Sequence, residues 1–188
     1  MKLHFRVYAF ACIALVSLSA VAADVYGIYF PNNLAGFTLG SVINNETDTP
    51  GQGYSLLYDH PGVKASVFVY NLGIKNIPNG DDSKIVHDAF ERAISDVKSV
   101  HPDAQNLDAT PQLSIHGISL LHAAFQYKAV ETGWHDVVFS HVYMTAQNGN
   151  FILVRTTYSA TDQSARGLRV EARFIEGLCG ALSASKAK

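Results

Sequence analysis

The chain has 188 residues, 48% of them hydrophobic, and a formal net charge of −2 with its histidines neutral. This length is enough to bury the core of one domain. The basic residues form no run that would bind a phosphate backbone, so nucleic acid is excluded as an expected partner.

The first 23 residues have the pattern of a secretory signal peptide. Lys2 and Arg6 precede an apolar segment at residues 7–21, and small residues follow it. The segment is shorter than the roughly 20 apolar residues that a membrane-spanning helix needs. We therefore expect cleavage after residues 1–23 and a single domain at residues 24–188, periplasmic or secreted, with no membrane insertion after cleavage.

The two cysteines have different expected fates. Cys12 lies inside the predicted signal peptide, and Ala9 stands three residues before it, where a lipidated cysteine usually has leucine, so no lipid anchor is expected. Cys179 is the only cysteine of residues 24–188 and cannot form an internal disulfide. Its apolar neighbours favour a buried side chain, and whether it is reactive stays open.

The first part of the predicted domain is rich in strand-forming residues. Val25–Phe30 and Phe37–Ile43 predict two strands, and Asn44–Gly53 has the composition of a surface loop. Tyr54–Tyr58 and Val63–Tyr70 then predict a hairpin, because proline and glycine between them supply turn geometry.

A helix is predicted from Ser83 to Val100. Its apolar residues recur at helical spacing and its charged residues occupy the opposite face, so one face should pack on a sheet. Pro102 ends the helix, and Asp103–Pro111 is predicted to be a connection.

Three longer strand-like runs follow. Gln112–Val130, Trp134–Gln147 and Asn150–Tyr158 predict an antiparallel meander, with Asn148-Gly149 as a strong hairpin signal. The first two runs do not alternate cleanly between apolar and polar residues, which indicates a sheet covered on both faces. A second helix is predicted to begin near Thr161-Asp162.

This order predicts an α+β domain, a mainly antiparallel β-sheet covered by two main helices. The chain resembles the PsbP-like α/β/α sandwich family in its early hairpins with Phe30-Pro31 and Gly36-Phe37, its helix from Asp82, its meander around Asn148-Gly149 and its terminal helix. The resemblance implies an accessory or binding role more than an enzyme.

Four histidines fall on the predicted meander in two pairs, each pair six residues apart. These are His116 with His122, and His135 with His141. If Val130 pairs with Gly133, His122 faces His141 across the two strands. Two facing imidazoles could hold Zn or Cu, although such a site needs three or four ligands. The alternative is that these histidines are structural.

Three tyrosines on the early hairpin are candidate ligand contacts. Tyr54, Tyr58 and Tyr70 could line a groove under the loop at Asn44–Gly53, where their rings would stack and their hydroxyls would form hydrogen bonds. Packing within the sheet is the competing interpretation.

The sequence contains no catalytic signature such as a nucleophile elbow or a dinucleotide-binding glycine pattern. The first hypothesis is therefore an exported, soluble, non-enzymatic binding or accessory protein of the bacterial envelope, without cofactor, whose partner is a protein or small ligand. The alternative is a metal-binding protein or metal-assisted hydrolase that uses His122 and His141 with Zn or Cu. A second alternative is an envelope structural component with an exposed strand edge.

Overall fold

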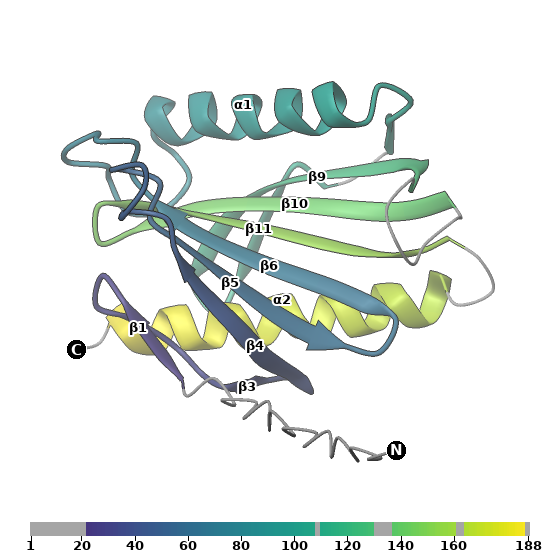
Figure 1. Cartoon of the computed structure of the whole chain (residues 1–188), viewed down its shortest axis with the longest axis horizontal. Helices are drawn as coiled ribbons and strands as arrows, with labels where there is room; N and C mark the ends of the chain where they lie inside the picture. The colour runs from purple at the N-terminus through teal and green to yellow at the C-terminus, as the bar shows by residue number, and fades with distance from the viewer. Residues whose placement is uncertain (1–21, 108–109, 130–136, 161–163, 187–188) are drawn as a thin grey trace, which may run out of the picture.

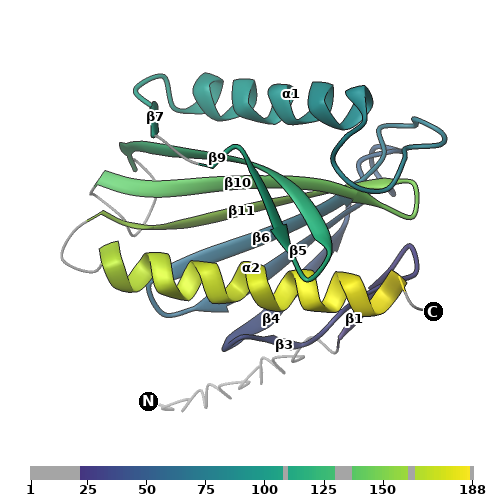
Figure 2. The same cartoon turned by 180° about the vertical axis from the view of Figure 1, so that it is seen from behind.

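The computed structural model describes residues 22–107, 110–129, 137–160 and 164–186. Residues 1–21 of the predicted signal peptide, His135, and the start of the predicted second helix lie outside this part of the chain. The fold is α+β, with one helix on each face of a nine-stranded antiparallel sheet (Figure 1, Figure 2). The predicted fold class is confirmed.

The sheet has the strand order β3-β4-β5-β6-β11-β10-β9-β7, and β8 also pairs with β9. The bounds of these strands are β3 (Asn33–Leu34), β4 (Phe37–Asn44), β5 (Tyr54–His60), β6 (Val63–Tyr70), β7 (Gln105–Leu107), β8 (Gln112–Ile115), β9 (Ile118–Lys128), β10 (Val137–Gln147) and β11 (Asn150–Ser159). Most neighbours are consecutive in the chain. The exceptions are the antiparallel pair of β6 and β11, which joins the two halves of the sheet, and the pair of β9 and β7 at its edge.

Helix α1 (Lys84–Val100) packs on one face of the sheet, and α2 (Ser164–Lys186) packs on the other. The Ser83 hydroxyl accepts a hydrogen bond from the Val86 amide and caps α1, as the sequence predicts for this start. Successive residues of a strand point to opposite faces. On β10, Val142 therefore joins the core under α1, while Tyr143 joins the core under α2.

The first predicted strand, Val25–Phe30, is a small hairpin instead. Strand β1 (Ala23–Val25) turns at Tyr26 and Gly27 and pairs with β2 (Ile28–Phe30). Both turn residues have left-handed backbone angles, φ 53° and 74°, which suit a two-residue hairpin turn. The prediction of one strand is wrong because this tyrosine-glycine turn interrupts a run of strand formers.

The predicted run Gln112–Val130 is likewise divided. A turn at His116 and Gly117, with φ 51° and 73°, separates β8 from β9, and the β8–β9 hairpin lies against α2 (Figure 2). His116 therefore lies in a turn and does not share a strand face with His122. The predicted connection Asp103–Pro111 also contains a short strand, β7.

The loop between β4 and β5 is anchored by one carboxylate. Glu46 accepts hydrogen bonds from the backbone amides of Gly51 and Gly53 at 2.9 and 2.8 Å. It also accepts one from the Tyr26 hydroxyl at 2.8 Å. These bonds lower the pKa of Glu46 and hold the loop against the β1–β2 hairpin.

None of the helices in the described ranges combines the length and apolar character that crossing a bilayer requires.

Candidate functional site

His122 and His141 are brought together, but by a different register from the predicted one. His122 on β9 pairs with Tyr143 on β10, and His141 pairs with Ala124, so the two histidines are diagonal neighbours. The predicted direct pairing is wrong by two residues. A shift of two keeps every side chain on its face of the sheet, and Nε2 of His122 lies 3.1 Å from Nδ1 of His141.

The hydrogen bonds of this pair define its protonation. Nδ1 of His122 lies 3.0 Å from the Thr110 carbonyl oxygen, which can only accept, so this nitrogen carries the proton. In the neutral ring, Nε2 of His122 then accepts from Nδ1 of His141. Nε2 of His141 in turn accepts from the Tyr158 hydroxyl at 3.1 Å.

Burial keeps both rings neutral near pH 7. Desolvation lowers the pKa of His122. Desolvation, together with the neighbouring His122, lowers the pKa of His141 to about 4. The pair therefore belongs to a partly buried chain of neutral hydrogen bonds that runs from Tyr158 to Thr110.

A buried glutamate from α2 lies beside this chain. Glu171 is 2% exposed and accepts hydrogen bonds from the hydroxyls of Tyr143 and Thr156. Desolvation raises its pKa to about 7, against the opposing effect of these two donors. Glu171 and Tyr158 also interact electrostatically, which contributes with burial to a Tyr158 pKa of about 12.

Helix α2 packs closely against the ring of Tyr158 at Gly167. A Cβ atom on Gly167 would lie 2.4 Å from Cδ2 of Tyr158, so α2 approaches the ring more closely than any larger residue allows. Gly177 and Gly180, two further glycines of α2, are less constrained. A Cβ atom there would make ordinary contacts, at 3.4 and 3.9 Å.

The histidine pair offers two nitrogens to a metal. A zinc or copper site needs three or four ligands. In the described ranges, no three His, Cys, Asp or Glu side chains are grouped to hold a metal ion. Binding of Zn or Cu by His122 and His141 stays a prediction.

The sheet separates the three candidate tyrosines. Tyr54 and Tyr58 belong to the core under α2, whereas Tyr70 packs against the core under α1. Tyr58 is 1% exposed and donates to the Pro31 carbonyl, and Tyr70 lies 5.4 Å from the ring of Phe151. These three side chains do not line one groove, and a ligand-binding role for any one of them is still a prediction.

Cys179 is buried in the core under α2, and burial raises the pKa of its thiol to about 12.

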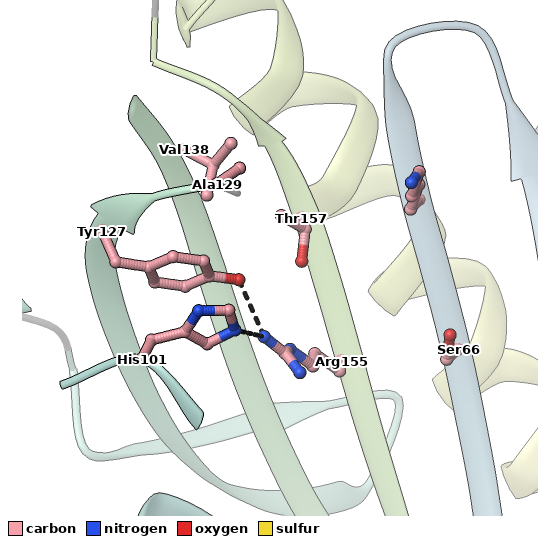
Figure 3. Close-up of a pocket in the computed structure, with 8 residues that line it drawn as sticks. Ser66, His101, Tyr127, Ala129, Val138, Arg155 and Thr157 are labelled. Carbon is pink, nitrogen blue, oxygen red and sulfur yellow. Dashed lines mark hydrogen bonds between the residues drawn. The ribbon is translucent and has the colours of Figure 1, made fainter. Parts of the chain in front are cut away.

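A polar cavity of about 150 Å³ opens on the opposite face of the sheet, at the end of α1 (Figure 3). Four of its lining residues form a square across the join of β6 and β11, because Arg155 pairs with Ser66 and Thr157 pairs with Lys64. The remaining lining residues come from β9, β10 and the segments that follow β9 and α1: His101, Tyr127, Ala129 and Val138.

Arg155 is fixed by neutral partners. Its Nη2 donates to the Tyr127 hydroxyl at 2.7 Å and to Nε2 of His101 at 3.3 Å, as the dashed lines in Figure 3 show. Its Nε donates to the Ser140 hydroxyl at 3.2 Å. The rings of His101 and Tyr127 are stacked, with centroids 3.9 Å apart, so both acceptors are themselves held in place.

The cavity has a cationic lining. Lys64 and Arg155 contribute positive charge, two hydroxyl groups lie beside them, and no acidic side chain is found among the described lining residues. Within the described part of the chain, no carboxylate lies within salt-bridge distance of Arg155. A fixed guanidinium with neutral partners is suited to bind an anion.

Sequence reasoning missed this cavity. One signal was available, because Arg155 is the only charged residue in the predicted strand Asn150–Tyr158. Its hydrogen-bond partners come from β9, from β10 and from the residue after α1, and only the fold places them beside it.

No protein-family model matches the chain, and no curated protein matches it. Among solved structures, the chain is similar to a protein of unknown function from Pseudomonas aeruginosa, PA94, described as a candidate regulator. The two share 9% identity, with 79% of this chain and 87% of that chain covered and a TM-score of 0.42. A similarity of this size says nothing about the function of this chain.

Proposed function

We propose that this chain is an exported, non-enzymatic binding protein of the bacterial envelope, and that it binds a small anion in the cavity at Arg155. The signal-peptide pattern of residues 1–23 supports export. The observation that carries the binding role is the guanidinium of Arg155, held by Tyr127, His101 and Ser140 at the wall of a cavity without an acidic residue among its described lining.

The chemistry of the lining favours a carboxylate or another small oxyanion. Ser140, Tyr127 and His101 use three of the five N–H donors of Arg155, so the two N–H groups of Nη1 remain to donate to an oxyanion. The hydroxyls of Ser66 and Thr157 are additional donors, and Lys64 adds charge from the exposed side of β6. Because three neutral groups already orient Arg155, little side-chain entropy is lost when an anion binds.

The test is calorimetric titration of residues 24–188 with acetate, inorganic phosphate and sulfate at low ionic strength. We expect at least one anion to bind with 1:1 stoichiometry, and binding to weaken as salt is added. Arg155→Gln should weaken it at least tenfold. Lys64→Gln, at an exposed position of β6, should weaken it by a smaller factor.

Arg169→Gln is the matched control, because it removes the same charge from an exposed position on α2, across the sheet. It should bind like the wild type. If none of the three anions binds, or if Arg155→Gln binds as tightly as Arg169→Gln, the proposal is wrong.

A further inference from the structure

A second, apolar groove adjoins the polar cavity and shares Arg155 with it. It has a volume of about 190 Å³ and lies between α1 and the sheet. Most of its lining is aliphatic or aromatic: Phe68 on β6, Val142 on β10, Leu153 on β11, and Ala93, Val97 and Val100 on α1. Arg155 therefore stands where a cationic cavity meets an apolar one.

From this junction we infer that the bound anion carries a short aliphatic chain. This rests on the proposed anion binding. The charged head lies at Arg155 in the polar cavity, and the chain lies in the groove beneath the last turns of α1. The ligand class is a medium-chain monocarboxylate or an equally amphipathic monoanion.

Two further observations support this occupant. Val100 is 66% exposed at the end of α1, where an aliphatic chain in the groove would cover it. Phe68 and Leu153 are only half-buried on the same face of the sheet. A volume of 190 Å³ accommodates about six groups of water size, at roughly 30 Å³ each, which fits a chain of a few methylenes.

The acidic residue of the groove restricts the charge of the ligand. Asp96 lines it from an exposed position on α1. A second negative charge along the chain would be repelled by this carboxylate, so a monoanion with one charged end is favoured over a dicarboxylate.

The experiment compares acetate, hexanoate and hexanol by calorimetric titration of residues 24–188. We expect hexanoate to bind at least tenfold more tightly than acetate, because burial of its methylenes is favourable. Hexanol should bind more weakly than hexanoate, since it lacks the charge that Arg155 recognises.

Ala93→Leu fills the groove from a buried position of α1, and Ser95→Leu places the same side chain on the exposed side of the helix. Ala93→Leu should abolish the preference for hexanoate and leave acetate binding unchanged, while Ser95→Leu should alter neither. If Ala93→Leu does not fold, Val100→Glu places a charge at an exposed lining position and should weaken hexanoate binding at least fivefold.

The outcomes separate the two proposals. Acetate binding that depends on Arg155, with hexanoate no tighter, overturns the aliphatic chain and leaves the anion site standing. Hexanol binding as tightly as hexanoate overturns the assignment of the charged head to Arg155. If neither acetate nor hexanoate binds, the aliphatic monocarboxylate is overturned, and the anion site stands only if phosphate or sulfate binds in a way that depends on Arg155.

Discussion

Nε2 of His122 and Nδ1 of His141 lie 3.1 Å apart although the two residues are not direct partners across β9 and β10. The direct partner of His122 is Tyr143, whose ring is stacked on the imidazole with centroids 4.3 Å apart. The diagonal contact places both histidines in the layer under α2 that also contains Glu171. This layer contains one buried acid, which is uncharged below its pKa, and two imidazoles, which are uncharged above theirs.

The first prediction concerns the pH dependence of stability. The folded pKa of His141 is about 4, below its ordinary 6.5, so its contribution to stability is lost as pH falls from 6.5 toward 4. The folded pKa of Glu171 is about 7, above its ordinary 4.5, so its contribution is complete below pH 4.5 and is lost as pH rises toward 7. Between these limits the two effects oppose each other and partly cancel.

Single substitutions should therefore expose opposite slopes between pH 6.5 and 4.5. The free energy of unfolding of Glu171→Gln should fall with decreasing pH, by about 1.4 kcal/mol per pH unit from His141. In His141→Asn the free energy of unfolding should fall less as the pH decreases, because His141 no longer contributes to the fall. Over this range its profile should therefore rise relative to that of Glu171→Gln. Urea unfolding at several pH values measures both. Parallel profiles for the two variants would contradict the opposite effects of His141 and Glu171 on the pH dependence of stability.

The second prediction compares two glycines of α2. Gly167→Ala drives a methyl group into the ring of Tyr158, and we expect it to destabilise the fold by about 1–3 kcal/mol, as overpacking does. Gly180→Ala meets nothing closer than 3.9 Å and should stabilise the helix by up to about 1 kcal/mol. Thermal unfolding should give shifts of opposite sign, and shifts of equal sign would show that the close approach at Gly167 is not limiting.

The third prediction concerns the thiol of Cys179. Because it is buried and its pKa is raised to about 12, we expect almost no reaction with an aromatic disulfide reagent in the native protein. When residues 24–188 are unfolded in guanidinium, one thiol per chain should react with the reagent. Fast labelling of the native protein would mean that the helix opens locally.

The fourth prediction concerns the loop anchored by Glu46. Glu46→Ala removes the acceptor of the Gly51 and Gly53 amides, so hydrogen exchange at these two amides should accelerate at least tenfold. Asp48→Ala, in the same loop, is the control and should leave both amides protected. If both variants exchange like the wild type, another group holds the loop.

The elements that local sequence determines were predictable. Helix α1 follows from its apolar spacing and its serine cap, and the β10–β11 hairpin follows from Asn148-Gly149. The turns at Tyr26-Gly27 and His116-Gly117 were missed because neither dipeptide is one of the common hairpin-turn signals, such as Asn-Gly or Asp-Gly. The register of β9 and β10 depends on contacts of both faces, and its error of two residues still preserved the histidine contact.

The cavity could not be derived in the same way. Its square of Lys64, Ser66, Arg155 and Thr157 exists only because β6 lies beside β11, and no local pattern in either strand states that adjacency. The stacked support from His101 and Tyr127 requires in addition the position where α1 ends. A binding site assembled from distant segments is visible only after the topology is known.

The pairing of β6 with β11 also limits the order in which parts of the sheet can form during folding. Val63 pairs with Tyr158 and Tyr70 with Phe151. The pair of β6 and β11 therefore closes a long segment of chain that contains α1 and the strands β7 to β10. During synthesis from the N-terminus, the hairpin of β5 and β6 must keep one hydrogen-bonding edge open until β11 has emerged. Such distant pairing is slow to form, and the square at Arg155 exists only after it has formed, so the arginine site is completed late in folding.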